Sequence, residues 1–192
     1  MPVRWAGRWR QRSYCCLVSI RDPNQHIREL RATRVYTSDP LSEEELTGIL
    51  EAGRWTGSSL NSQPWTFVVV TDPGMKHGLS ETGRFATHLV SSAVVIVLVG
   101  APGRGDFDIG RAAQNMMLAA DTLGIGSCPA TLHDEESARR LIGAPDDRSA
   151  RHAIAFGYPN QELEHTARRN MKLVTGPARK PLDEVVRWNT YE

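Results

Sequence analysis

The chain has 192 residues, of which 40% are hydrophobic and 23% charged, and its formal net charge is +1. This length suits one compact domain with its own core, and the near-neutral charge provides no field for nucleic acid or an anionic membrane. The longest apolar run, residues 93–99, is far shorter than the roughly 20 residues of a membrane-spanning helix. We therefore expect a globular protein that binds neither nucleic acid nor a membrane.

The N-terminal segment differs in character from the rest of the chain. Residues 1–20 carry several arginines and two tryptophans, without the apolar stretch that a signal peptide would place after its basic region. We expect a disordered basic extension over residues 1–20 and one domain over residues 21–192. Two alternatives are an arm that binds an anionic surface and a natural start near Val18.

Cysteines and histidines give no sign of a metal site or of disulfides. Cys15, Cys16 and Cys128 fit neither a disulfide framework nor a zinc-ligand spacing. The six histidines show no ligand pairing such as i, i+4 on one helix. We expect no bound metal and a reducing, cytoplasmic location.

The apolar periodicity predicts alternating helices and strands. Ser42 and Glu45 form a capping box that opens a helix, Asp108 and Asp134 are expected helix caps, and Gly124 follows a helix end. Residues 160–181 are polar and lack a clear period. In chain order we expect a helix at 24–31, a helix opening at 42, a strand at 66–71, a helix at 75–88, a strand at 93–100, a helix at 108–123, a strand at 127–131, a helix at 135–142 and a strand at 151–156.

Residues 56–65 form the most informative loop. Their sequence, TGSSLNSQPW, combines a flexible backbone with hydroxyl and amide side chains and then enters a buried strand. Such a loop can hydrogen-bond a polar, planar ligand from several directions, although a plain polar turn is the alternative. The chain has no nucleophile elbow, no phosphate-binding P-loop and no dinucleotide-binding glycine motif that opens a helix.

Two basic pairs could bind an anion. Arg31 and Arg34 lie three residues apart near an expected helix end, and Arg179 and Lys180 lie near the C-terminus. Guanidinium groups suit a phosphate because they offer forked donors that stay charged. On spacing alone, solvated side chains are the favoured interpretation of both pairs.

The loop and the basic pairs together resemble the nitroreductase family of flavoproteins. Residues 57–65 resemble its P-S-x-x-N-x-Q-P-W signature, and residues 31–36 with 41–46 resemble its N-terminal R-S-x-R-x-F element and the following helix. Residues 108–127, 156–159 and 179–186 resemble its central helix, last strand and C-terminal tail in the same order. The resemblance spans roughly residues 31–188.

The resemblance implies an α+β, nitroreductase-like three-layer α/β/α sandwich. Its central sheet would be mixed and mainly antiparallel, and the chain would form an intertwined homodimer with two FMN sites at the subunit interface. The implied cofactor-binding residues are Arg31, Ala32, Arg34, Ser58, Asn61, Gln63, Thr131, Leu132, Arg179 and Lys180.

The resemblance also divides these residues by role. Arg31, Arg34 and Arg179, with Lys180, would hold the phosphate and ribityl chain, and Ser58 with Asn61 would reach the flavin from the partner subunit. Gln63 and the backbone near Thr131 and Leu132 would hydrogen-bond the ring edge, the last of these near the flavin N5. No side chain of this chain would act as a nucleophile or general base.

The implied activity is that of an FMN-dependent oxidoreductase. It would take hydride from NAD(P)H and reduce a small electron acceptor, such as a nitroaromatic or quinone, by a ping-pong mechanism. The chain departs from the family at Leu30 and Ala32, where an arginine and a serine are usual, and at Gly57, where a proline is usual. A deazaflavin-linked or flavin-consuming enzyme and a non-catalytic flavin-binding protein are therefore alternatives.

Overall fold

The computed structural model describes residues 22–101, 105–172 and 179–191. The expected basic extension at residues 1–20 lies outside the described residues. None of the helices in the described ranges is long and apolar enough to cross a membrane.

A four-stranded sheet forms the centre of the molecule, in the order β1-β2-β4-β3 with every neighbouring pair antiparallel. All seven residues of β2 are buried, as expected for a central strand with helices on both faces. Within the described ranges, the parallel contact next to this sheet is an isolated bridge between Ala32 and Ser127. The strands are β1 (Trp65–Val70), β2 (Val94–Gly100), β3 (Gly126–Thr131) and β4 (Ser149–Gly157).

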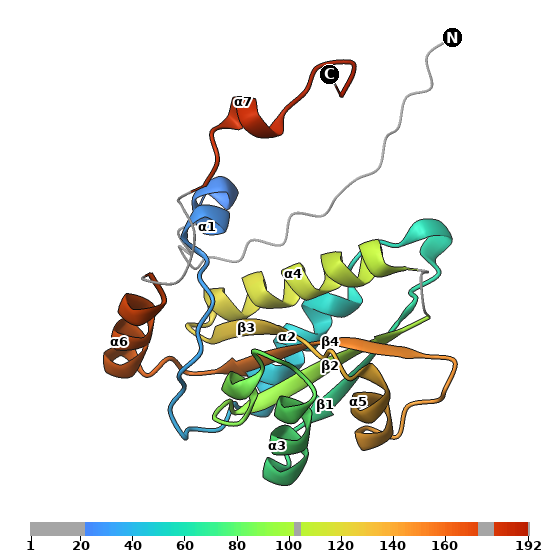
Figure 1. Ribbon diagram of the computed structural model, residues 1–192, viewed down its shortest axis with the longest axis vertical. Helices are drawn as coiled ribbons and strands as arrows, with labels where there is room; N and C mark the ends of the chain where they lie inside the picture. Colours follow the sequence, from blue (N-terminus) through green and yellow to red (C-terminus); the bar gives the residue numbers. More distant parts are fainter. Residues whose placement is uncertain (1–21, 102–104, 173–178, 192) are drawn as a thin grey trace, which may run out of the picture.

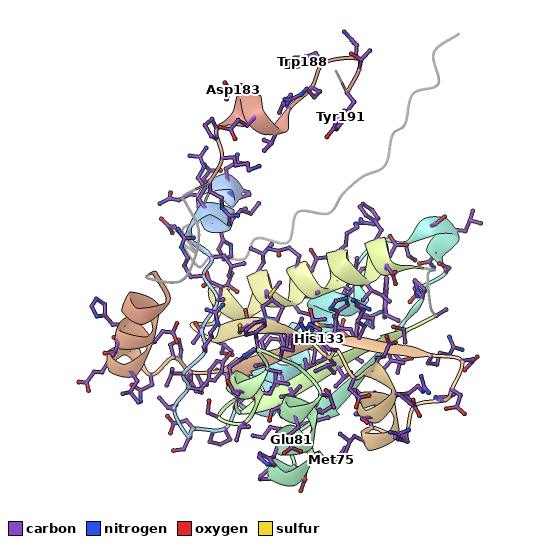
Figure 2. The ribbon with its side chains drawn as sticks, in the orientation of Figure 1. Met75, Glu81, His133, Asp183, Trp188 and Tyr191 are labelled. Atoms are coloured by element: carbon purple, nitrogen blue, oxygen red, sulfur yellow. The ribbon has the colours of Figure 1, made fainter. Side chains whose placement is uncertain are left out.

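Helices cover both faces of the sheet, which confirms the three-layer arrangement (Figure 1). One face packs against α2 (Glu43–Arg54) and α4 (Asp106–Thr122), and the other against α3 (Pro73–Glu81), η2 (Thr87–Leu89) and α5 (Glu135–Leu141). Figure 2 shows Met75 and Glu81 on α3, on the side of the sheet away from α4. Because successive strand residues point to opposite faces, Ile154 and Ala153 belong to different cores.

The expected helix starts are largely confirmed. Ser42 and Glu45 make both hydrogen bonds of the capping box at the start of α2, and the Asp134 side chain accepts from Ser137 N at 3.0 Å at the start of α5. The predicted cap of α4, Asp108, was wrong by three residues. Its cap is Gly105, whose φ of 80° is a left-handed conformation that favours glycine, and Asp108 lies inside the first turn.

The expected helix at 75–88 is also wrong in its length, because α3 ends at Glu81 and η2 follows as a separate turn. Gly83 explains the break: a Cβ on this residue would lie 2.6 Å from the carbonyl oxygen of Thr131. The backbone must therefore pass directly against the end of β3. The Thr82 carbonyl accepts from Asp134 N at 2.9 Å and holds this crossing in place.

The C-terminal part contains a helix that the polar sequence did not predict. α6 (Gln161–Lys172) begins after Asn160, whose side-chain oxygen accepts from Leu163 N at 3.2 Å. Beyond it, α7 (Leu182–Val185) belongs to an arm that projects away from the sheet, as does α1 (Pro23–Glu29) (Figures 1 and 2). Trp188 and Tyr191 at the end of this arm are 84% and 91% exposed.

Two glycines of α2 provide a matched test of how closely α2 packs. A Cβ at Gly48 meets no atom within 4 Å, so Gly48→Ala should stabilise the protein by up to about 1 kcal/mol through helix propensity. A Cβ at Gly53 would overlap the fully buried Met116 side chain and lie 3.1 Å from Cζ of Phe67. We expect Gly53→Ala to destabilise by about 1–3 kcal/mol. Urea unfolding measures both changes, and equal free energies of unfolding for the two variants would contradict this packing.

Candidate functional site

The segment after α1 runs along the free edge of β3. Ala32 forms its bridge with Ser127, and Thr33 N donates to the Ser127 carbonyl at 2.8 Å. A Cβ on Gly126 would lie 2.6 Å from Oγ1 of Thr33, so the glycine permits this close approach. Arg31 is exposed and donates to the Leu30 carbonyl at 2.8 Å. The first predicted anion-binding element therefore lies at the start of β3.

Arg34 is half-buried beside the start of β3, where the preceding Thr33 N donates to the Ser127 carbonyl. Burial raises the pKa of the Cys128 thiol on β3, and the Arg34 guanidinium opposes part of that rise. Burial also lowers the pKa of His88 on η2, and the same guanidinium lowers it further. Of the two arginines, Arg34 is thus the more buried, and Arg31 is exposed.

The backbone at the end of β3 offers one outward donor. Leu132 N donates to the Arg151 carbonyl at 2.8 Å, so this amide is already used within the sheet. Since backbone groups alternate in direction along a strand, the Thr131 amide points to the free edge. Of the two predicted ring-edge contacts, the Thr131 amide is the one that faces the direction of Arg34 and the segment before it.

The polar loop has an unusual backbone and is held by α4. Leu60, Asn61 and Gln63 have φ values of 52°, 54° and 46°, which non-glycine residues rarely adopt. Such strain persists only when surrounding contacts enforce it and is concentrated at functional sites. The Ser58 hydroxyl accepts from Gln63 N at 2.8 Å, and Arg111 on α4 donates to the Gly57 carbonyl at 2.7 Å. The exposed polar side chains of this loop are thus presented in a fixed arrangement.

The loop and the arginine segment lie at opposite ends of α4. Ser59 N donates to the Asp108 carboxylate at 3.3 Å, near the helix start, whereas His26 of α1 pairs with Asp121 at 2.8 Å, near its end. From Asp108 to Asp121 the helix advances by about 20 Å at its usual rise per residue. One chain therefore does not bring Arg34 and Asn61 together.

The other two predicted residues also lie apart from the edge of β3. Arg179 and Lys180 are exposed and precede α7 on the projecting arm. No contact in the described part of the chain brings either residue to Arg34.

A hollow of about 350 Å³ lies between the first half of α4 and the sheet, close to Thr131. Pro129 lines it and shares a strand face with Thr131, two residues further on. His152, directly opposite Thr131 on β4, lines the same hollow, and burial lowers its pKa, assisted by Arg151. This size and mainly apolar lining suit a planar organic ligand. A second hollow, between α3 and α5, contains none of the predicted site residues.

Sequence reasoning missed three side chains of this region. His88 is buried, and its Nε2 atom has no hydrogen-bond partner among the described residues; Glu164 is buried beside Arg34, and His152 lines the hollow. Each reaches the site through tertiary packing rather than through a local motif. Within the described ranges, no group of three or more histidine, cysteine, aspartate or glutamate residues could hold a metal ion.

Comparison with known proteins gives consistent matches. A model of the nitroreductase family matches residues 27–81 and 91–158, more than half of the chain. A candidate NADH dehydrogenase/NAD(P)H nitroreductase of Archaeoglobus fulgidus is 32% identical over 145 residues, covering 70% of this chain and 83% of that protein. An NADPH-flavin oxidoreductase of Vibrio harveyi is 25% identical over 154 residues, covering 70% and 64% respectively. The crystal structure of a candidate NADH dehydrogenase/NAD(P)H nitroreductase from Parabacteroides distasonis matches with a TM-score of 0.73 at 25% identity, covering 88% and 98%.

Burial of His88 predicts a pH dependence of stability. The unfolded chain binds a proton at the ordinary histidine pKa of about 6.5, whereas the folded protein resists protonation of His88. The free energy of unfolding should therefore fall as the pH drops below that value. We expect His88→Gln to lose less stability than wild type between pH 7 and pH 5 in thermal unfolding. His77→Gln, at an exposed histidine, should keep the wild-type slope, and an equal slope in both variants would exclude His88 as the cause.

Proposed function

Because this chain belongs to the nitroreductase family and is an NAD(P)H-dependent oxidoreductase, we propose that it binds FMN and reduces small electron-poor acceptors. The observation that carries this proposal is the free edge of β3. There Arg34 lies beside the start of the strand, the Thr131 amide points outward at its end, and a mainly apolar hollow lies next to Pro129. The name of the Vibrio harveyi relative, a flavin oxidoreductase, supports the choice of cofactor.

The residues at this edge fit the chemistry of a flavin mononucleotide. Arg34 and Arg31 supply positive charge for the phosphate and ribityl chain, and the Thr131 amide supplies a donor for the ring edge near N5. Pro129 and its neighbours in the hollow supply an apolar surface for the ring. When bound, the flavin would accept hydride from the nicotinamide and pass the electrons to the acceptor. The chain's own groups would bind and orient it without acting as nucleophile or base.

The proposed active unit is an intertwined homodimer. Ser58 and Asn61 are held at the far end of α4 from Arg34, so they would complete the site of the partner subunit rather than that of their own. Arg179 and Lys180, at the start of the projecting arm, would likewise act in the partner's site. The exposed Trp188 and Tyr191 on this arm supply apolar surface for a second copy.

The proposed cycle is ping-pong. NAD(P)H would bind over the ring and leave as NAD(P)⁺, and a nitroaromatic or quinone would then enter the same space. The cytoplasm supplies the nicotinamide, and the buried, free thiol of Cys128 is compatible with a reducing compartment. A deazaflavin in place of FMN is the second candidate, favoured by Leu30 standing where the family usually has an arginine.

The cofactor is tested by an absorbance spectrum of the purified protein, followed by anaerobic addition of NADH and then NADPH. We expect a flavin band that bleaches with at least one nicotinamide, because the ring accepts hydride directly. A colourless protein that FMN does not reconstitute would contradict the proposal and favour the deazaflavin. Bound flavin that neither nicotinamide reduces would instead indicate a non-catalytic flavin-binding protein.

The two-chain site is tested by subunit complementation. Arg34→Ala and Asn61→Ala should each weaken FMN binding, because each removes one side of every site. In a heterodimer of the two variants, one site receives Arg34 and Asn61 from different chains and is intact, while the other lacks both. We therefore expect co-expression to restore a fraction of FMN binding and NAD(P)H oxidation. Failure of the mixture to exceed the two separate variants would place both residues in one chain's site.

A further inference from the structure

Backbone hydrogen bonds from the residues just before α6 hold the segment that contains Arg34 in place. Asn160 N donates to the Val35 carbonyl at 3.0 Å, and Thr37 N donates to the Tyr158 carbonyl at 2.9 Å. Between these contacts, Tyr36 bridges Pro159. This segment is neither helix nor regular strand, so its conformation depends on such contacts.

One side chain of α6 enters this junction. Glu164 is only 5% exposed, whereas its neighbours Glu162 and Leu163 in the same turn are exposed. A single carboxylate oxygen, Oε2, accepts from both Arg34 N and Val35 N at 2.9 Å. Hydrogen bonds to a charged acceptor are stronger than neutral ones, and more so away from solvent.

The two amides that Glu164 binds lie on either side of the Arg34 Cα atom. The peptide plane before Arg34 carries its own N–H, and the plane after it carries the N–H of Val35. Fixing both planes fixes φ and ψ of Arg34 and hence the direction of its Cα–Cβ bond. The backbone fixed in this way lies at the edge of β3, because Ala32 bridges Ser127 and Thr33 N donates to the Ser127 carbonyl at 2.8 Å.

We propose that Glu164 is a positioning residue for Arg34: its carboxylate fixes the backbone around Arg34 and so directs the guanidinium to the edge of β3, where the flavin would bind. This inference rests on the proposed function, and it adds α6, which carries no family motif, to the flavin site. The flavin itself would contact Arg34 rather than Glu164.

A double-mutant cycle with FMN tests this role. The wild type, Glu164→Ala, Arg34→Ala and the double variant are freed of flavin and titrated with FMN by fluorescence, with thermal unfolding recorded in parallel. We expect Glu164→Ala to weaken FMN binding about tenfold. In the Arg34→Ala background the same change should have almost no effect, because the residue that it positions is gone.

Two further variants separate positioning from general stability. Glu164→Gln keeps an oxygen that can accept both amides, so it should restore much of the affinity lost in Glu164→Ala. Glu162→Ala removes an equal charge from the exposed side of the same turn and should bind FMN as the wild type does. If Glu164→Ala does not fold, Glu164→Asp, whose shorter side chain withdraws the carboxylate from both amides, completes the cycle in both backgrounds.

The outcomes distinguish this inference from the proposed function. Additive losses in the cycle, or a Glu164→Ala variant that binds FMN as tightly as a flavin-binding wild type, would overturn the positioning role alone. A wild-type protein that binds no FMN would overturn both. A non-additive cycle with recovery in Glu164→Gln supports both together.

Discussion

The free edge of β3 is the constraint on which the rest of the site depends. An edge strand exposes unpaired backbone groups, and folded proteins cover such edges or interrupt them. Here Pro129 removes one outward N–H, Thr33 pairs with the carbonyl of Ser127, and Gly83 packs against the carbonyl of Thr131. The edge is thus closed at both ends and keeps an outward amide at Thr131. A planar ligand with hydrogen-bonding groups on its rim is well suited to the space that is left.

The length of α4 separates the polar loop at residues 56–65 from the segment that contains Arg34. Its first turns hold the strained loop through Asp108 and Arg111, and its last turn meets α1 through Asp121. Because a helix is rigid over this length, no loop movement within one chain would join them. The strained residues Leu60, Asn61 and Gln63 would therefore contribute to the proposed flavin site only through a partner subunit. The projecting C-terminal arm would likewise contribute its basic residues to the partner subunit's site.

Much of this fold is predictable from the sequence because its signals are local. The capping box at Ser42, the glycine at position 124 and the uninterrupted apolar run of β2 each define an element through neighbouring residues. The failures arise from distant contacts. The helix after Asp72 stops early because Gly83 must approach β3, and α6 was missed because its stabilising contact, Glu164 to the Arg34 segment, lies 130 residues away in the sequence. The sequence motifs indicated candidate site residues in the loop and around Arg34. Only the packing shows that these two groups lie at opposite ends of α4.

The departure at position 30 makes the backbone around Arg34 more important. Leu30 brings no charge to the edge of β3, and the Arg31 guanidinium is engaged by carbonyls of its own turn, those of Arg28 and Leu30. Arg34 is half-buried, whereas Arg31 is exposed. In the proposed site Arg31 would therefore compensate only in part for an error in the direction of Arg34. Fixing its backbone with a buried carboxylate limits the conformational entropy that would otherwise be lost on binding a ligand, which is the physical advantage of preorganisation.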